Sequence, residues 1–312
     1  FPVVETFDYT ANTDLIASND WSDASTSSTP NNIQVVTGTI ANPFTSNEYP
    51  DPTGNMVTLS GGGSDPYIAF NAANEVFASF LFTATDMSTV SNPNGAYFVV
   101  LAQPSGSFRA RLFVKPDATD GAKFNIGVST GSSSNNYSPT AFSTGVEVFI
   151  VMSYNTANDE IKVWINPSAS TFEGTPAASD LTESIGSTEA VGRFILRQDS
   201  TSETPSINFD ELRIDTNWSG VTPKGATASV GRDNIEGFAA YPNPVNDKKF
   251  TVKTSSSSSK LINVFNVLGK KVFTQSFSGQ QKTMDISVLN SGIYILKVTQ
   301  DGKTSTKKLV IR

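Results

Sequence analysis

"VEVFIVMSY" (146–154) and "EIKVWI" (160–165) are the two segments that decide the fold of this 312-residue chain. Both have the length of a β-strand, and both are rich in the β-branched and aromatic residues that strands favour. The short segment between them contains the Asn and Asp residues that are typical of a turn. Together they predict two strands joined at a hairpin.

Similar runs recur along the first 220 residues, at 77–84, 97–102, 108–114 and 123–129. Clusters of Gly, Asn, Ser and Pro separate them, and no stretch has a helical period long enough for a core helix. The pattern therefore predicts an all-β fold with an antiparallel β-sandwich at the N-terminal end.

The composition limits the possible function classes. A chain of 312 residues suggests two domains, and 38% hydrophobic with 16% charged residues is typical of a globular protein. The net charge of -7, with scattered acidic residues, argues against nucleic acid as a partner. The longest apolar runs are far shorter than a membrane-spanning helix.

Two residue types are missing from the chain, Cys and His. Their absence excludes disulfides, thiolate metal sites, imidazole bases and a Ser-His-Asp triad. The sequence starts at Phe1 without Met, so we expect that a secretory signal peptide precedes it and is removed.

A second domain is predicted after a short polar connection. The segment 224–237 is small and polar with no strand pattern, so we interpret it as a linker between a passenger domain at 1–223 and a small domain at 238–312. The small domain contains short strands joined by "LGK" and "DGK" turns. It is predicted to be an immunoglobulin-like β-sandwich.

Four motifs occur in order in this small domain: "YPNPVND", "INVFNVLGKKV", "LNSGIYILKV" and the terminal "KKLVIR". In this order they resemble the type A sorting domain of type IX secretion. The residues that match the motifs are Tyr241, Pro242, Asn243, Pro244, Gly269, Gly292, Tyr294, Lys307 and Lys308. The purely structural alternative is that these residues only make the start of a strand rigid, shape a hairpin and fill a core.

The resemblance implies a Gram-negative cargo protein that crosses the outer membrane and is released or held at the cell surface. It implies the type IX translocon and an outer-membrane β-barrel shuttle protein as partners. It also implies a sortase, with a processing site in the linker at 224–237.

The passenger domain carries looser motifs: "ETFDY", "LFVKPDATDGAKFNIGVS", "IKVWINPS" and "INFDELRIDTNW". They resemble the concanavalin A-like, laminin G-type jelly roll, a family that includes lectins, adhesion modules and glycoside hydrolases. The hydrolases of this fold carry E-x-D-x-x-E on one strand, and no such string occurs here. The nearest acidic clusters are Asp159 with Glu160, and Asp210, Glu211 and Asp215. We therefore expect that the chain is not an enzyme.

Alternation instead predicts a binding face. Phe108, Ala110, Leu112 and Val114 share one side of their strand, which leaves Arg109 and Arg111 on the other. On the later strand Lys162, Trp164 and Asn166 are predicted to point outward. If the two strands are neighbours, the indole stacks on a sugar ring while the guanidinium groups bind carboxylate oxygens.

Three functions follow from this face, in falling order: binding of an extracellular glycan without cleavage, adhesion to a protein, and glycoside hydrolysis. The purely structural alternative is that Trp164 lies under a loop and that the arginines only keep a sheet soluble.

A structural cation is a further expectation, since relatives of the jelly roll often hold calcium. Asp210 alternates with Leu212 and Ile214, so it is predicted to point to the apolar side and to need a partner. Glu5 and Asp8 supply further oxygen ligands of the kind calcium prefers. The alternative is an Asp210 carboxylate capped by backbone N–H groups or by Arg213.

Overall fold

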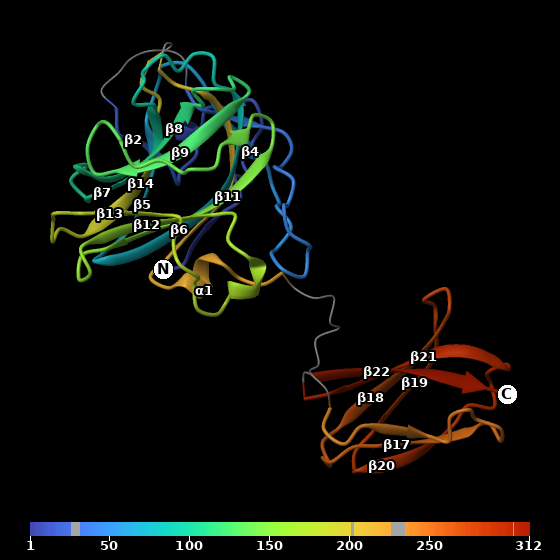
Figure 1. Ribbon diagram of the computed structural model, residues 1–312. Coiled ribbons are helices and arrows are strands. Elements are labelled where there is room, and N and C mark those ends of the chain that lie inside the picture. Colours follow the sequence, from blue (N-terminus) through green and yellow to red (C-terminus); the bar gives the residue numbers. More distant parts are fainter. Residues whose placement is uncertain (26–31, 201–202, 226–234, 302) are drawn as a thin grey trace. The chain divides into compact units, whose positions relative to one another are not determined.

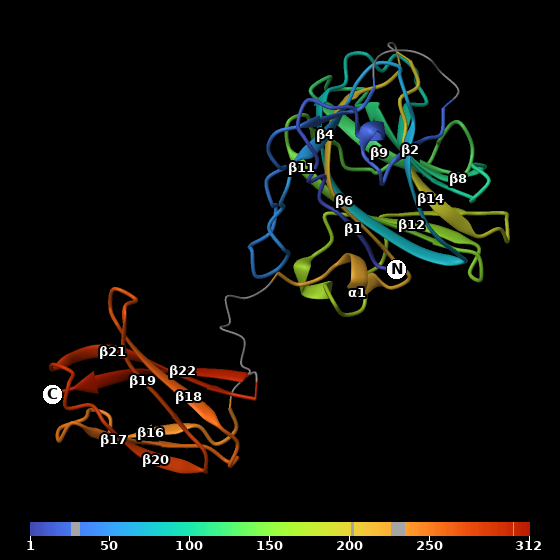
Figure 2. The same ribbon diagram turned by 180° about the vertical axis from the view of Figure 1, so that it is seen from behind.

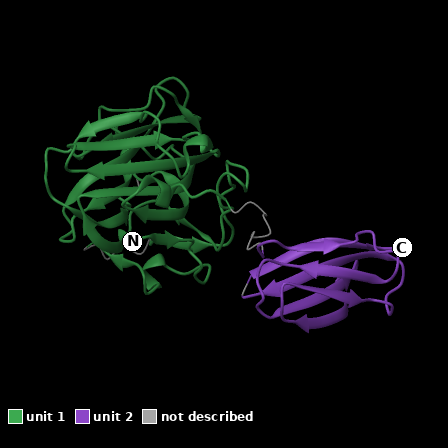
Figure 3. Cartoon of the chain, turned by 90° about the horizontal axis from the view of Figure 1, so that it is seen from below, with its two compact units in different colours: residues 1–227 green, residues 228–312 purple. Residues whose placement is uncertain are grey.

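The computed structural model describes residues 1–25, 32–200, 203–225, 235–301 and 303–312. It consists of two compact units, residues 1–227 and 228–312 (Figure 3). The division between them lies inside the predicted linker 224–237. Most of that linker, residues 226–234, lies outside the described residues, and so does any processing site there.

The first unit contains an eight-stranded antiparallel sheet among its described residues. Its strand order is β13-β12-β11-β6-β15-β4-β3, with β1 paired to the side of β15. The strands are β1 (Val3–Glu5), β3 (Gln34–Val36), β4 (Met56–Leu59), β6 (Glu75–Asp86), β11 (Glu147–Asn155), β12 (Glu160–Ile165), β13 (Leu181–Ser184) and β15 (Ser206–Asp215). The predicted hairpin is confirmed, because Val151 on β11 pairs with Trp164 on β12.

A seven-stranded sheet in the order β10-β9-β8-β7-β14-β5-β2 forms the other layer of this unit in the described ranges (Figures 1 and 2). Its strands are β2 (Ser22–Asp23), β5 (Pro66–Ala73), β7 (Ala96–Ala102), β8 (Phe108–Pro116), β9 (Lys123–Ser129), β10 (Phe142–Ser143) and β14 (Val191–Leu196). Strands that are distant in sequence, such as β5 and β14, are neighbours in this sheet. The predicted jelly-roll sandwich is confirmed.

The main core lies between the two sheets and follows the alternation of their strands. Phe80 and Phe82 on β6 meet Phe98 on β7, with ring centroids 6.5 and 5.1 Å apart. Ala110, Leu112 and Val114 on β8 belong to this core, as their spacing predicts.

A second apolar cluster covers the outer face of the eight-stranded sheet. Phe149 and Val151 on β11 pack there against loops that carry the 3-10 helix η2 (Ala169–Thr171) and the short helix α1 (Trp218–Val221). Another short 3-10 helix, η1, spans Leu15–Ala17. Because both faces of β11 are buried, its sequence is a continuous apolar run rather than an alternating one.

The second unit is a smaller β-sandwich, as the sequence predicts. Its described residues form a three-stranded sheet in the order β16-β17-β20 and a four-stranded sheet in the order β19-β18-β21-β22. The strands are β16 (Ala239–Tyr241), β17 (Lys249–Lys253), β18 (Lys260–Asn266), β19 (Lys271–Phe277), β20 (Gln281–Asp285), β21 (Gly292–Gln300) and β22 (Lys303–Ile311). Its core includes Ile235, so the fold begins earlier than the predicted residue 238.

No helix within the described ranges is long and apolar enough to cross a membrane.

Candidate functional site

The five residues predicted to bind a glycan are divided between the two sheets. Arg109 and Arg111 lie on β8 of the seven-stranded sheet. Lys162 and Trp164 lie on β12 of the eight-stranded sheet, and Asn166 follows that strand directly. The structure does not bring the two groups together, because β8 and β12 belong to opposite layers of the sandwich.

Trp164 is covered rather than displayed, which corresponds to the structural alternative that it lies under a loop. Its side chain is only 4% exposed, and its Nε1 donates a hydrogen bond of 2.8 Å to the carbonyl of Ala177 in the covering loop. Its ring centroid lies 6.4 Å from Phe77 and 5.0 Å from Trp218. An indole in this position stabilises the loop, and it also lines the small cavity beside Lys162.

The two polar residues that were predicted to bind a ligand together with Trp164 also have contacts within the fold. Asn166 accepts a hydrogen bond of 2.8 Å from the backbone N–H of Phe149. Lys162 forms an ion pair of 2.7 Å with Glu160 at the wall of a cavity of about 120 Å³. A role for Lys162 in ligand binding stays a prediction, and any such site is separate from the arginines of β8.

A β-bulge changes the predicted face of β8. Leu101 pairs with Ala110 and Ala102 pairs with Phe108, so Arg109 is the extra residue between them. Phe108 therefore packs on the outer face of the sheet, against the expectation from alternation. Arg109 acts electrostatically on Tyr154, a residue of the core between the sheets.

Arg111 does lie on the outer face of the seven-stranded sheet, as predicted, and other cationic and aromatic side chains join it there. We define the arginine face as Tyr67, Tyr97, Phe108, Arg111, Arg193 and Arg197. It crosses the adjacent strands β5, β14, β7 and β8, and beneath it Val100, Ala102 and Ile195 are fully buried.

Each arginine of this face packs on an aromatic ring. The guanidinium carbon of Arg111 lies 5.4 Å from the ring centroid of Tyr97 and 5.3 Å from that of Phe108. Arg197 lies 4.7 Å from Tyr97. Arg193 lies 4.2 Å from Tyr67. These cation–π contacts hold the guanidinium planes against the sheet.

Two donors of the arginine face have no partner. Arg111 Nε and Arg197 Nη1 are buried and make no hydrogen bond in the described part of the chain. Arg111 Nη1 donates to the carbonyl of Thr130. Burial lowers the pKa of Arg111, but a guanidinium stays charged in proteins. Buried donors without acceptors are rare, and Arg109 Nε is another such donor in the described residues, outside this face.

Two carboxylates, Asp65 and Asp199, oppose this positive charge at Arg197. Asp65 lies 3.6 Å from Arg197 Nε and accepts a hydrogen bond of 2.9 Å from the backbone N–H of Gln198. Burial raises the pKa of Asp65 to about 6. Arg197 also pairs with Asp199 at 3.1 Å, whereas no ion pair involves Arg111 or Arg193 in the described ranges.

Sequence reasoning missed Arg193, Arg197 and the tyrosines of the arginine face. A signal was present, because Arg193, Ile195 and Arg197 alternate with buried residues in "RFILRQ" (193–198). What local sequence does not contain is the pairing of β14 with β7, which brings these arginines beside Arg111.

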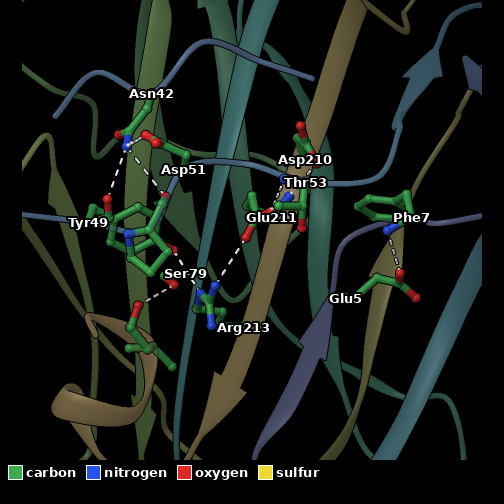
Figure 4. A network of polar contacts seen from close by, with 12 residues as sticks. Glu5, Phe7, Asn42, Tyr49, Asp51, Thr53, Ser79, Asp210, Glu211 and Arg213 are labelled. Atoms are coloured by element: carbon green, nitrogen blue, oxygen red, sulfur yellow. Dashed lines mark hydrogen bonds and ion pairs between the residues drawn. The ribbon is translucent and has the colours of Figure 1, made fainter. Parts of the chain in front are cut away.

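The buried carboxylates of β15 belong to a network within the eight-stranded sheet (Figure 4). Asp210 accepts hydrogen bonds of 2.9 Å from the N–H of Ile40 and 2.8 Å from the N–H of Glu211. Burial raises the pKa of Asp210 to about 7. Glu211 pairs with Arg213 at 3.1 Å and accepts from the N–H of Thr53 at 2.9 Å. Asp210 is thus capped by backbone N–H groups, as the alternative to calcium predicts.

The residues predicted to bind calcium do not form one ligand set in the described residues. Both carboxylate oxygens of Glu5 already accept hydrogen bonds, from Phe7 N–H at 2.6 Å, Tyr9 OH at 2.6 Å and Trp21 Nε1 at 2.9 Å. Asp8 is exposed to solvent. The described residues contain no group of three or more Asp, Glu, His or Cys that could hold a metal ion.

The remaining acidic candidates have structural partners too. Asp159 accepts a hydrogen bond of 2.8 Å from the N–H of Gly186 at the hairpin tip, and Glu160 pairs with Lys162. Asp215 accepts from the N–H of Asn217, the residue before helix α1, at 3.2 Å.

The motif residues of the second unit come together around its last strand. Asn243 donates a hydrogen bond of 2.7 Å to the carbonyl of Lys308 and accepts one of 2.9 Å from the N–H of Val310. It follows Tyr241 and Pro242 and precedes Pro244, and the peptide bonds before both prolines are cis. The first and last sequence motifs are therefore parts of one contact.

The other motif residues shape turns and strand ends. Gly269 has a φ of 77° in the turn after β18, a backbone conformation that favours glycine. Tyr294 donates a hydrogen bond of 2.9 Å to the carbonyl of Asn290, just before Gly292 opens β21. The ammonium group of Lys307 lies 5.7 Å from the ring centroid of Phe238.

Comparison with known proteins gives one curated relative at the level of sequence. The chain is 30% identical over 126 residues to "Ulvan lyase NLR42" of Nonlabens ulvanivorans, which is 40% of this chain and 22% of that protein. An alignment of this length is longer than the whole of 239–312, so it includes residues outside the motif-bearing domain. The expectation that the chain is not an enzyme is contradicted by this match.

Solved structures resemble the first unit more distantly. A pentraxin from Limulus polyphemus is 15% identical with a TM-score of 0.37, over 53% of this chain and 79% of that chain. Lectin II from Ulex europaeus is 11% identical with a TM-score of 0.36, over 69% and 97% of the two chains. The fold assignment rests on the strand order and registers given above.

A family model described as "Secretion system C-terminal sorting domain" matches residues 239–312. The match covers the four motifs from "YPNPVND" to "KKLVIR", and it agrees with the small sandwich of the second unit. Residues 239–312 are a C-terminal sorting domain of type IX secretion, which directs the chain across the outer membrane to the cell surface or the medium.

Proposed function

We propose that the first unit acts outside the cell on a polysaccharide that carries carboxylate or sulfate groups, and that the arginine face binds it. The observation that supports this most is the pair of buried, unpartnered donors on Arg111 and Arg197. An anionic oxygen supplies the acceptor that these donors lack, and hydrogen bonds between charged groups are about twice as strong as neutral ones.

The shape and chemistry of the face also suit a polymer chain. Four adjacent strands carry it, and three strand spacings correspond to about 14 Å. Sugar rings pack on aromatic surfaces, and Tyr67, Tyr97 and Phe108 supply such surfaces between the charges.

Cleavage of the polymer by β-elimination is a second, more specific candidate, which the match to a protein named as a lyase favours. This reaction removes the proton next to a uronate carboxylate, breaks the bond to the neighbouring glycosidic oxygen, and leaves a double bond in the ring. The leaving oxygen takes up a proton. It requires cations at the carboxylate and a general base within reach of the proton.

Tyr97 is the group of the arginine face that is best placed to serve as this base. The guanidinium carbons of Arg111 and Arg197 lie 5.4 and 4.7 Å from the centroid of its ring. In the proposed reaction Arg111 and Arg197 neutralise the uronate carboxylate. Tyr97, reacting as the phenolate, accepts the proton from the ring carbon and passes it to the glycosidic oxygen as that oxygen leaves.

The binding proposal is tested by titrating the full-length chain with a polyuronate, a sulfated polysaccharide and a neutral glucan. We expect Arg111→Gln to weaken binding of the two anionic polymers by roughly tenfold or more. Lys249→Gln is the matched control, because it removes the same charge from an exposed position on β17 of the second unit and should leave the affinity unchanged. Equal losses in both variants, or equally tight binding of the neutral glucan, would contradict the proposal.

The cleavage proposal is tested by following the ultraviolet absorbance of the unsaturated uronate product. Tyr97→Phe keeps the aromatic ring under Arg197, so we expect binding to persist while product formation stops. If the wild-type chain binds polyuronates and forms no product from any of them, elimination is refuted and the binding proposal stands.

A further inference from the structure

The sorting domain exposes apolar side chains at one end of its four-stranded sheet. Ile293 and Ile295 on β21 are 50% and 44% exposed, and Val267 and Leu268 in the turn after β18 are 72% and 88% exposed. Cross-strand pairing places Ile295 opposite Phe265 of β18, and Ile293 opposite Val310 of β22. We call this set the apolar end patch: Phe265, Val267, Leu268, Ile293, Ile295 and Val310.

The patch is a second apolar face and not a part of the core. Leu296 and Val298 on β21 alternate with it and are fully buried between the sheets of the domain. In an antiparallel sheet with one solvated face, the outward positions are normally polar. At the other end of the same face the exposed Leu261 has polar neighbours, Ser276 and Thr299.

The turn that carries Val267 and Leu268 is held in a fixed conformation. The side chain of Asn266 accepts hydrogen bonds from the N–H groups of Leu268 and Lys270, at 3.1 and 2.9 Å. Gly269 closes the turn with its positive φ. These contacts present the two side chains to solvent without any packing cost inside the domain.

Several residues of the sorting motifs make contacts that hold the fold together. Asn243 fastens the first motif to β22, Tyr294 bonds to Asn290, and Gly269 shapes the turn. Their contacts explain why the domain folds, but a receptor reads what is displayed on the surface. The apolar end patch is an apolar surface that the same motifs display, beside exposed residues such as Tyr241 and Lys308.

Basic residues surround the patch. Lys308 on β22 lies opposite Ile295, Lys271 on β19 lies opposite Phe265, and Lys297 follows Ile295 on the same side of β21. The whole segment 239–312 contains twelve Lys and Arg against three Asp and Glu, whereas the chain as a whole has 22 against 29. The positive charge is therefore concentrated in this domain.

We propose that the apolar end patch is the surface by which the type IX export machinery holds the sorting domain, and that the receptor offers an apolar groove with an acidic rim. The groove covers the aliphatic side chains, and the rim pairs with Lys271, Lys297 and Lys308. A flat apolar surface with charges at its edge is the usual composition of a protein interface.

The test is export of residues 1–312, placed behind a signal peptide, from a cell with an active type IX system. Ile295→Thr keeps a β-branched residue on an exposed strand position, and Leu268→Ser changes an exposed turn, so neither should lower the melting temperature appreciably. We expect each to reduce the exported fraction roughly tenfold, as for the loss of one interface hot spot. Lys308→Glu should act in the same direction.

Leu261→Thr is the matched control, because Leu261 is 42% exposed on the same face at its polar end. We expect normal export of this variant. Export that is unchanged in Ile295→Thr and Leu268→Ser, or lost equally in Leu261→Thr, would overturn the proposal. Two other outcomes would also overturn it. In the first, the purified chain is a dimer that Ile295→Thr dissociates while export continues. In the second, anionic lipid vesicles bind the chain and Lys308→Glu abolishes this binding while export continues.

Discussion

Asp65 and Arg197 make the charge of the arginine face depend on pH. With a pKa of about 6, Asp65 is neutral below that value and negatively charged above it. Asp23 and Asp199 are the further charged groups that act on it, besides Arg197. Protonation of Asp65 removes the negative charge beside Arg197, so the face becomes more positive as the pH falls.

The affinity for a sulfated polysaccharide is therefore expected to fall roughly two- to fivefold as the pH rises from 5 to 7, as for a partly exposed charge pair. Sulfate esters stay ionised throughout this range, so the change reports the protein alone. Asp65→Asn should flatten the profile. An equally steep profile in the variant would assign the titration to another group.

Trp164 gives a second prediction at the scale of single residues. Replacing it by Ala removes a buried ring and leaves the carbonyl of Ala177 without its donor. We expect the free energy of unfolding to fall by about 3–5 kcal/mol, measured by denaturant titration. Lys162→Ala, two residues earlier on β12, should stay within about 0.5 kcal/mol of the wild type. A Trp164→Ala variant with wild-type stability would show that the covering loop does not depend on the indole.

At the scale of strands, local sequence predicts the inward residues well and the site poorly. Alternation placed Leu112 and Val114 in the core and Arg111 outside because the side-chain period of a strand is two. It misplaced Phe108 because a bulge adds one residue at Arg109, and no local signal marked it.

The arrangement of strands limits the prediction further. Arg111 and Trp164 were expected on one face, but β8 and β12 belong to different sheets. Which strands become neighbours depends on contacts between distant segments, such as β14 with β7, and local patterns do not contain this information. The sorting motifs were easier to assign because their residues and order are specific in themselves.

The last strand gives a prediction at this scale. Deleting residues 307–312 removes Leu309 and Ile311 from the core and the two backbone groups that Asn243 binds on β22. We expect the sorting domain to lose its cooperative unfolding transition in calorimetry and the chain to be retained in the periplasm. Lys308→Glu, in contrast, should block export in a domain that still melts cooperatively. Normal export of the truncated chain would separate sorting from folding of this domain.

At the scale of the whole molecule, each unit has a core of its own. Ile235 belongs to the core of the second unit, and its N–H donates a hydrogen bond of 2.9 Å to the hydroxyl of Ser305. We therefore expect residues 235–312, fused behind a signal peptide and a foreign protein, to carry that protein out of a type IX-competent cell. Immunoblotting of the medium and of the cell surface measures the exported protein. A fusion that starts at 239 lacks Ile235 and should be exported less. Periplasmic retention of the longer fusion would show that sorting needs the first unit.

The most direct measurement for the proposed function is a crystal structure of the full-length chain with a uronic acid oligosaccharide. We expect a sugar carboxylate to accept hydrogen bonds from Arg111 and Arg197, with the sugar rings packed along Tyr97, Phe108 and Tyr67. An oligosaccharide bound in the cavity beside Lys162 on the opposite sheet, or an arginine face that stays free of ligand at saturating concentration, would contradict it.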